Sequence, residues 1–294
     1  MPESRDARIW LNAGADHARR KHMSLGKTIR LKRVLNHPTN TSVICALDHG
    51  MTSPVFLEPL ADIRARVTEA VAGGANVLML SRGMSRIAAA ELSQTTAVAY
   101  MLSASADPGE NPSIAAVAEV EEALRSGADA VVLYVALGTD TEQDMIERLA
   151  EVGSACDELG MPFIAEAEWP SAYSGTTSEL GTDYLLRNVR LCAELGADVI
   201  KTNWPGSGEE YARLVASAAG LPTVLAGGSR ITEAELLTRQ QHAMEAGAVG
   251  CSVGRNIFMH ENPEAMTRAL KRVIVDRWTA ERALEELGAA AAAR

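Results

Sequence analysis

Lysine is scarce in this chain, and one lysine stands where it could act as a nucleophile. Of the five lysines, Lys201 is the only one between residues 33 and 270, and it lies in the run Ala-Asp-Val-Ile-Lys-Thr-Asn at 197–203. Burial at the end of a strand lowers the pKa of an ammonium and favours the neutral amine, which can attack a carbonyl to form a Schiff base. The alternative is an ion pair with Glu166 or Glu168, and position alone does not decide between the two.

A carboxylate and an imidazole follow another apolar run. Asp48 and His49 come directly after Ser-Val-Ile-Cys-Ala-Leu at 42–47. Strand alternation places Asp48 on the same face as Ala46, whose small side chain leaves room for a carboxylate. Asp48 could transfer a proton or bind a substrate hydroxyl, and the alternative is a cap for the following loop. His49 faces the other way on this count, which favours a supporting or capping role.

Glycine-containing turns follow two further apolar runs. Gly227 and Gly228 come after Pro-Thr-Val-Leu-Ala, and Gly254 and Arg255 come after Cys-Ser-Val. Glycine lets a phosphate approach backbone N–H groups, and an arginine adds a charge-assisted hydrogen bond. Ordinary turns also use glycine, but two such turns at matching strand ends favour a phosphate site.

Metal ligands are sparse at these positions. A zinc site would need two or three ligands there, so we expect no metal and no cofactor. The chain has six histidines, at 17, 22, 37, 49, 242 and 260, and only His49 follows an apolar run. Asp48, Glu166 and Glu168 could hold Mg²⁺ through oxygen, so a magnesium-bound enolate stays an alternative.

The elements that position these residues repeat along the chain as a small-residue turn, an apolar run and then polar or glycine residues. We expect eight strands, at 42–47, 73–80, 96–102, 127–133, 162–165, 196–200, 222–226 and 247–253. Helical patterns lie between them, at 63–72, 115–125, 142–159, 184–195 and 233–246. Eight alternating units predict a single α/β (β/α)8 TIM barrel, with its active site at the carboxyl ends of the strands. A doubly wound sheet is disfavoured because no Gly-x-Gly-x-x-Gly follows the first strand.

The two ends of the chain decorate this barrel. We expect an N-terminal extension at 1–24, a barrel domain at 25–288 and a disordered tail at 289–294. Helical patterns at 8–21 and 25–35 could close the bottom of the barrel, and residues 263–288 should form one last helix.

Composition excludes several classes of protein. No apolar run reaches the roughly 18 residues of a membrane span, and the charged N-terminus has no apolar segment typical of a secretory signal. Four cysteines without a CxxC pair fit a reducing cytoplasm. The net charge of −10 does not favour binding to nucleic acid. We therefore expect a cytoplasmic protein without membrane or nucleic-acid partners, which binds a small phosphorylated molecule at a local positive site.

Five motifs together make the chain similar to a known family. They are Leu-Asp-His-Gly at 47–50, Gly-Gly-Ala-Asn at 73–76, Gly-Ala-Asp-Val-Ile-Lys-Thr-Asn at 196–203, Ala-Gly-Gly at 226–228 and Val-Gly-Arg-Asn-Ile-Phe at 253–258. From about residue 25 to about residue 287 the chain resembles the archaeal-type class I aldolases. That family includes fructose-bisphosphate aldolases, synthases of 2-amino-3,7-dideoxy-heptulosonate, and aldolases that join dihydroxyacetone phosphate to aspartate semialdehyde toward 3-amino-4-hydroxybenzoate.

The resemblance implies a role for each matching residue. Lys201 would form the Schiff base, Asp48 would take part in proton transfer, and the turns at 227–228 and 254–255 would hold phosphate. The implied reaction adds the enamine of a phosphorylated ketone, such as dihydroxyacetone phosphate, to an aldehyde such as aspartate semialdehyde. The other two family activities are alternatives, as are a metal-enolate lyase and a non-catalytic barrel that binds a sugar phosphate. Relatives form rings of subunits, so we expect a homo-oligomer.

Two departures from the family pattern point to an altered acceptor. Trp169-Pro170 stand where the family has Tyr-Pro-Arg-Gly, and an indole cannot exchange protons near neutral pH. The candidates for proton transfer are then Asp48, Glu168, Tyr134 and Tyr173. Ser81-Arg82-Gly83 stand where relatives often have His-Lys-Gly, and we count Arg82 and His49 among the substrate-binding candidates.

Overall fold

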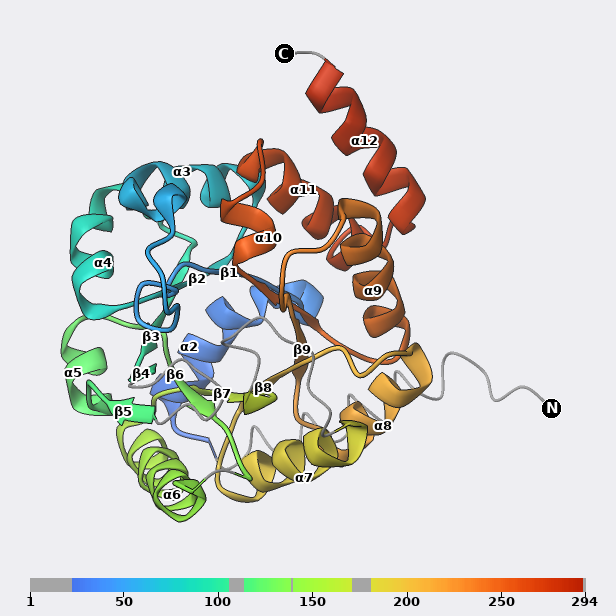
Figure 1. Ribbon diagram of the computed structural model, residues 1–294. Coiled ribbons are helices and arrows are strands. Elements are labelled where there is room, and N and C mark those ends of the chain that lie inside the picture. The colour runs from blue at the N-terminus through green and yellow to red at the C-terminus, as the bar shows by residue number, and fades with distance from the viewer. Residues whose placement is uncertain (1–22, 106–113, 139, 171–180, 293–294) are drawn as a thin grey trace.

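Parallel strands close into a barrel at the centre of the molecule (Figure 1). The computed structural model describes residues 23–105, 114–138, 140–170 and 181–292. Around the barrel the order is β1-β10-β9-β8-β7-β6-β3-β2. The first and last strands of the chain, β1 and β10, therefore pair with each other and close the barrel. The barrel strands are β1 (Ser42–Ala46), β2 (Val77–Leu80), β3 (Ala97–Met101), β6 (Ala130–Val135), β7 (Phe163–Ala167), β8 (Val199–Thr202), β9 (Thr223–Ala226) and β10 (Gly250–Val253). The predicted eight-stranded TIM barrel is confirmed.

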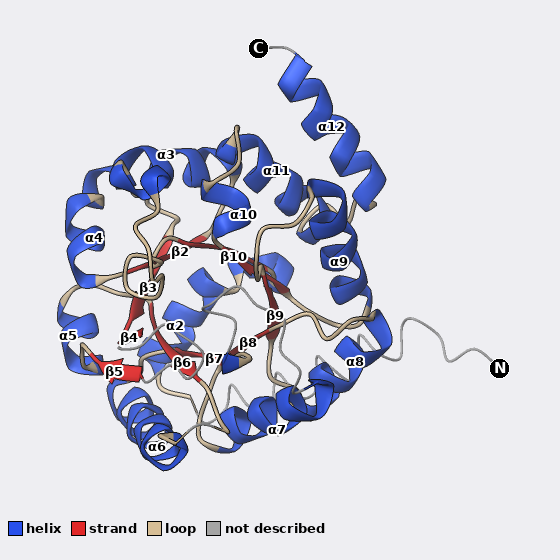
Figure 2. Ribbon diagram, in the orientation of Figure 1, coloured by secondary structure: helices blue, strands red, loops and turns tan. Residues whose placement is uncertain are grey.

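Most helices surround the strands, as the blue ring around the red barrel in Figure 2 shows, whereas α2 lies across the barrel inside this ring. The helices are α2 (Leu25–Val34), α3 (Ile63–Gly73), α4 (Arg82–Ile87), α5 (Val120–Arg125), α6 (Glu142–Leu159), α7 (Gly181–Glu194), α8 (Gly208–Ser217), α9 (Glu233–Glu245), α10 (Arg255–Phe258), α11 (Pro263–Ile274) and α12 (Ala280–Ala292). The predicted helix at 142–159 has the bounds of α6. The helix predicted at 8–21 lies outside the described residues.

Alternate residues of the barrel strands face its inside, because successive side chains of a strand point to opposite faces. One buried cluster joins inward residues of the strands, among them Ile164 and Val199, to Val34 of α2, which therefore closes one end of the barrel. The residues two positions further along the same strands are Glu166 and Lys201. The inside of the barrel thus changes from apolar to charged toward the carboxyl ends of its strands.

The helix predicted at 115–125 is wrong in its first part. Residues Ile114–Ala116 form strand β5, which pairs antiparallel with β4 (Ser103–Ser105). The next residue continues this pairing, since the Val117 N–H donates to the Leu102 carbonyl at 2.9 Å. The helix begins only at Val120, because the backbone up to Val117 is hydrogen-bonded to β4 and to Leu102 before it.

The single C-terminal helix predicted at 263–288 is two helices. The break follows Ile274. Arg277 there adopts a left-handed φ of 58°, and the ring of Trp278 is contacted by two guanidinium groups, those of Arg272 at 4.6 Å and Arg282 at 3.6 Å from its centre. Helix α12 then continues to Ala292 and so includes residues 289–292 of the predicted tail.

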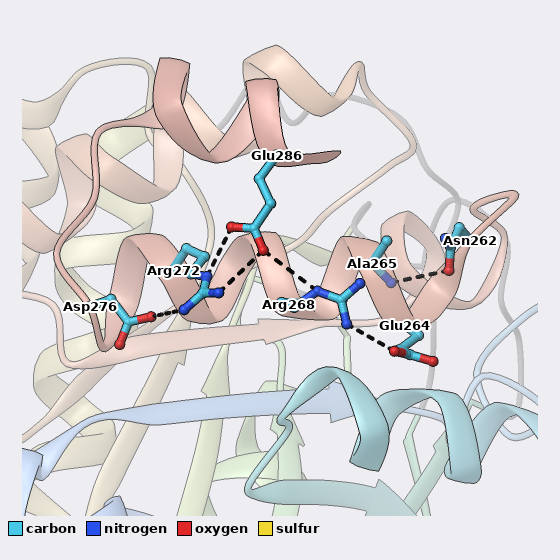
Figure 3. A network of polar contacts seen from close by, with 7 residues as sticks. All are labelled: Asn262, Glu264, Ala265, Arg268, Arg272, Asp276 and Glu286. Carbon is cyan, nitrogen blue, oxygen red and sulfur yellow. Dashed lines mark hydrogen bonds and ion pairs between the residues drawn. The ribbon is translucent and has the colours of Figure 1, made fainter. Parts of the chain in front are cut away.

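Glu286 holds α12 against α11, as Figure 3 shows. Its carboxylate pairs with Arg272 at 2.9 Å and with Arg268 at 3.7 Å. Arg272 also pairs with Asp276, just after α11, and Arg268 also pairs with Glu264 within α11. None of the described helices is both long enough and apolar enough to cross a membrane.

Candidate active site

A cavity of about 190 Å³ opens at the carboxyl ends of the barrel strands. It is smaller than the roughly 300–1,000 Å³ that hold drug-sized ligands, so its size fits a small metabolite. The residues that line it are Ala46, Asp48, His49, Thr52, Ser53, Pro54, Val55, Leu57, Glu166, Glu168, Lys201, Gly227, Gly228, Ser252, Gly254 and Arg255. The structure therefore brings the predicted lysine, aspartate, Glu168, His49 and glycine-containing turns together in one cavity.

Lys201 lies among carboxylates in this cavity. Its Nζ is 2.6 Å from Glu166 Oε1 and 2.8 Å from Glu168 Oε1, and its side chain is 12% exposed. Glu166 and Lys201 are paired residues of the neighbouring strands β7 and β8, which sets them side by side on the inward face. Lys201 therefore forms ion pairs with both glutamates, and this pairing does not exclude its predicted role as the nucleophile.

The neutral amine expected from burial is not the form of Lys201 that the surrounding charges favour. Burial by itself lowers the pKa of Lys201, but the charges of Glu166, Glu168 and Asp48 together outweigh it and raise the pKa above its ordinary value. The resting side chain is therefore an ammonium ion. To act as a nucleophile it must first pass a proton to one of its neighbours.

Two of these neighbours are suited to take that proton. Burial raises the pKa of Glu166 to about 7, with Lys201 opposing the rise and Glu168 and Asp48 adding to it. Burial also raises the pKa of Asp48 to about 6, against the lowering effect of Lys201. Groups with pKa values near the working pH transfer protons most effectively, so the cavity holds acid–base groups next to its amine.

The glycine-containing turns lie on the β9–β10 side of the cavity. Gly228 has a left-handed φ of 62°, and a Cβ at Gly254 would lie 2.3 Å from His49 Cε1 and 2.7 Å from the Ala46 carbonyl oxygen. Arg255 follows directly, and burial lowers the pKa of its guanidinium below its ordinary value. Glycine is thus required in one turn by conformation and in the other by close packing.

Asn256 joins the two turns, a role that the sequence analysis did not assign. Its Nδ2 donates to the carbonyls of Gly227 and Ser229 at 3.0 Å each, and its Oδ1 accepts the Ile231 N–H at 3.0 Å. The only feature of the sequence that points to this role of Asn256 is its place directly after Arg255. Glu166 was also left out of the predicted catalytic set, although its inward position follows from strand alternation with Ile164.

His49 lines the cavity rather than facing away from it. Its Nδ1 is 3.7 Å from Asp48 Oδ1, and its ring packs edge-on against Phe258 with 5.1 Å between ring centres. Burial, together with the charges of Arg255 and Lys201, lowers the pKa of His49 to about 3. The imidazole is therefore neutral, and the predicted direction was wrong because the chain has already left the strand and turned at this residue.

Two of the described candidates do not line the cavity. Arg82 is directed to Glu122, with 2.5 Å between Nε and Oε1, and donates to the Val117 carbonyl, so its predicted contact with substrate is not supported. The Tyr134 hydroxyl is buried and donates to the Trp169 carbonyl at 2.9 Å. Its burial and the charge of Glu168 raise its pKa well above 10, so it is a poor proton donor or acceptor. Tyr173 lies outside the described residues.

Metal ligands do not gather in the part of the chain that the structure describes, where no group of three or more His, Cys, Asp or Glu could hold an ion. Between Glu166 and Glu168 the position of a cation is taken by the ammonium of Lys201.

The barrel and its lysine centre agree with a family of carbon–carbon lyases. Residues 42–260, well over half of the chain, match the DeoC/LacD family aldolases. The chain therefore belongs to the DeoC/LacD aldolase family, and it is an enzyme of the aldehyde-lyase type.

Individual relatives are similar over most of their length. The chain is 34% identical over 265 residues to the 2-amino-3,7-dideoxy-D-threo-hept-6-ulosonate synthase of Halobacterium salinarum, covering 90% of this chain and 97% of that one. It is 33% identical over 276 residues to the 2-amino-4,5-dihydroxy-6-oxo-7-(phosphonooxy)heptanoate synthase of Streptomyces griseus, covering 91% and 97%. A Schiff base-forming fructose-1,6-bisphosphate aldolase shares the fold, with a TM-score of 0.75, 24% identity and coverage of 84% of this chain and 99% of that one.

Proposed function

We propose that this aldolase is a class I enzyme in which Lys201 forms a Schiff base with a phosphorylated ketone, and the resulting enamine adds to an aldehyde. The observation that carries this is the placement of Lys201 Nζ within 2.8 Å of two carboxylates, in a cavity that Arg255 also lines. An amine among acid–base groups is what imine formation requires, and a guanidinium supplies the positive site for a phosphate.

The donor ketone is held at its phosphate end by the turns. Backbone N–H groups at Gly228 and Gly254 and the guanidinium of Arg255 bind the phosphate, whereas the Gly227 N–H donates to the Ser252 carbonyl at 3.0 Å and shapes the turn. This local positive site works despite the net charge of −10, because the charge that a ligand meets in a cavity is set by the groups that line it. The ketone carbon then lies toward Lys201, which lines the same cavity.

The carbon–carbon bond forms through the enamine. After the imine has formed, Asp48 or Glu168 removes a proton from the donor carbon next to the iminium, and the electron pair of that C–H bond becomes the enamine double bond. The enamine carbon attacks the aldehyde carbon, the aldehyde oxygen takes up a proton, and water releases the product from Lys201. Both carboxylates line the cavity, whereas Tyr134 does not.

The Streptomyces griseus relative indicates a donor and an acceptor. Its product carries hydroxyls at C4 and C5, a ketone at C6 and a phosphate ester at C7. Breaking the C4–C5 bond of such a product gives dihydroxyacetone phosphate and aspartate semialdehyde. We propose the same pair for this chain. Fructose bisphosphate cleavage and heptulosonate synthesis are the alternative reactions of the same site.

The test is reductive trapping. Wild-type protein is treated with sodium borohydride in the presence of dihydroxyacetone phosphate and analysed by intact and peptide mass spectrometry. We expect a stable adduct on the peptide that contains Lys201. Lys201→Met and Lys201→Arg should give none, and Lys201→Arg is the matched control because it keeps a cation among the carboxylates.

Failure has defined meanings. Folded wild-type protein that gives no adduct with dihydroxyacetone phosphate or fructose bisphosphate would contradict the Schiff-base mechanism. Aldolase activity that is then lost on adding a chelator would indicate the metal-enolate alternative. Binding of the phosphate ester without turnover would indicate a non-catalytic barrel. A cytoplasmic location and assembly into homo-oligomers stay predictions from the sequence.

A further inference from the structure

Two glutamates contact the same lysine nitrogen, but their positions differ. Glu166 lies within β7, in register with Lys201, and its Oε1 accepts a hydrogen bond from Nζ at 2.6 Å. Glu168 lies just beyond the strand, and its Oε1 is an ion-pair partner at 2.8 Å without accepting a hydrogen bond from the described residues. The Glu168 side chain is also the more exposed of the two, at 10% against 4%.

We propose that the two glutamates divide the proton transfers of the reaction. Glu166 carries protons from Lys201 Nζ to the ketone oxygen that leaves as water, and Glu168 removes the proton from the donor carbon once the imine exists. This inference rests on the proposed Schiff base at Lys201. It makes Glu166 a catalytic residue that the sequence pattern did not assign.

The protons balance with Glu166 as their only carrier. The ammonium gives one proton to the Glu166 carboxylate, and the nitrogen lone pair forms the N–C bond while the carbonyl π electrons move to oxygen. That oxygen takes the proton from Glu166, the nitrogen returns a second proton to Glu166, and this proton converts the hydroxyl into departing water. Glu166 starts and ends as a carboxylate, and the two protons lost by nitrogen leave in the water molecule.

The number of N–H groups decides which glutamate is released for the second task. An ammonium has three N–H donors and can serve both carboxylates, whereas an iminium has one. The in-register partner with hydrogen-bond geometry, Glu166, keeps that N–H. Glu168 loses its partner and is free to act as a base.

Two hydrogen bonds hold the backbone of Glu168, so we assign this change to its side chain. Its N–H donates to the Glu166 carbonyl at 3.0 Å, and its carbonyl accepts from Asn188 Nδ2 at 3.4 Å. A base whose backbone is hydrogen-bonded in place can take a proton from a correctly oriented substrate without a loop movement.

The surroundings of Glu166 support an exchange of protons at neutral pH. The charged and titratable groups that interact with it are Lys201 of β8, Asp48 after β1, Glu168 and, on β6, Tyr134. Burial and the two other carboxylates raise its pKa to about 7 against the effect of Lys201. A carboxyl group with this pKa can both accept and return a proton.

The experiment compares Glu166→Gln with Glu168→Gln, the same substitution two residues apart in one cavity. The first readout is the rate at which a borohydride-trappable adduct forms with dihydroxyacetone phosphate. The second is the exchange of the donor's C–H proton with D2O, followed by NMR without any acceptor aldehyde. General acid–base groups contribute about 10²–10⁴-fold, which sets the expected size of each loss.

We expect Glu166→Gln to slow adduct formation by about 10²–10⁴-fold. Glu168→Gln should form the adduct within about threefold of the wild-type rate but lose C–H exchange by about 10²–10⁴-fold. Formate should partly restore adduct formation to a Glu166→Ala variant, which a purely structural role would not predict.

The opposite pattern, or equal losses in both readouts for both variants, would overturn the division of roles. Wild-type adduct formation in Glu166→Gln would do the same. These results differ from a failure of the proposed function, in which the wild-type protein itself forms no adduct and the inference falls with it.

Discussion

Two buried lysines lie at opposite ends of the same barrel, and each pairs with two carboxylates. Lys27 of α2 has its Nζ 2.6 Å from Asp157 Oδ1 and 2.9 Å from Asp198 Oδ2, directly before β8. Lys201 near the other end of β8 has Nζ–Oε1 distances of 2.6 and 2.8 Å to its two glutamates. Judged by the ion pairs alone, the two sites are the same.

The difference lies in what surrounds each pair. A third carboxylate, Asp48, and a second cation, Arg255, share the cavity of Lys201, and the pKa values of Asp48 and Glu166 are raised to about 6 and about 7. Lys27 is the only cation among the described residues that line its hollow. Its partner Asp198 also accepts the Phe163 N–H at 3.0 Å, which ties that carboxylate to the barrel. The surroundings of Lys201 suit the proposed proton exchange and anion binding, whereas the Lys27 pair joins helix α2 to the residue before β8.

Replacement of Lys201 gives the largest expected effect on activity. Lys201→Arg keeps the positive charge but cannot form an imine, so aldolase turnover should fall by about 10⁴-fold or more while the fold is retained. Steady-state kinetics with the proposed donor and acceptor, together with thermal melting, would measure both. Residual activity within about tenfold of wild type would contradict the covalent role.

Replacement of Lys27 should reduce the stability of the protein and leave its activity nearly unchanged. Lys27→Met leaves Asp198, whose side chain is 5% exposed, without its cation, and breaking a buried pair in this way costs about 3–5 kcal/mol of the free energy of unfolding. Denaturant unfolding would measure the loss, and kcat per folded molecule should change by less than about twofold. The Lys27→Met, Asp198→Asn double variant is the matched control and should recover part of the stability. A Lys27→Met protein that is stable but inactive would contradict the structural role assigned to Lys27.

Replacement of Arg255 tests the proposed binding of the donor's phosphate in the Lys201 cavity. Arg255→Gln removes a charge-assisted contact worth about 1.5–3 kcal/mol, so KM for dihydroxyacetone phosphate should rise by about 10–100-fold with a smaller change in kcat. Unphosphorylated dihydroxyacetone is the control substrate, and its KM should stay within about twofold. Equal losses for both substrates would place the role of Arg255 elsewhere.

Sequence patterns located the site but not its protonation. Strand alternation and strand ends were enough to bring Lys201, Asp48 and the glycine-containing turns to one edge of the barrel. They could not show that Glu166 and Glu168 converge on one nitrogen, and three carboxylates reverse the pKa change that burial alone produces. Arg82 was misplaced because its partner, Glu122, comes from a distant segment. The break between α11 and α12 carries neither glycine nor proline, and it accompanies contacts of Trp278 with two arginines that the local sequence pattern does not reveal.

The pH dependence gives the smallest expected effect and distinguishes the two lysine sites by titration. Glu166 must be a carboxylate to accept the proton of Lys201, so the rate of adduct formation should fall about tenfold per pH unit below about pH 7. Because the pKa in the folded protein lies above the ordinary 4.5, Glu166 favours folding at low pH, and this contribution is lost as the pH rises from 4.5 to about 7. Acidification through this window should therefore reduce adduct formation without any loss of stability from Glu166.

Borohydride trapping between pH 5.5 and 8, with thermal melting in the same buffers, would separate the two effects. Glu166→Gln should flatten the acid side of the profile, because its side chain does not titrate. Lys27→Met should keep the wild-type profile, since Lys27 lies at the other end of the barrel and contacts none of the cavity carboxylates. The apparent pKa belongs to the group of Glu166, Asp48 and Lys201 together. An unchanged acid side in Glu166→Gln would assign the titration to Asp48, and adduct formation would then depend on the aspartate after β1.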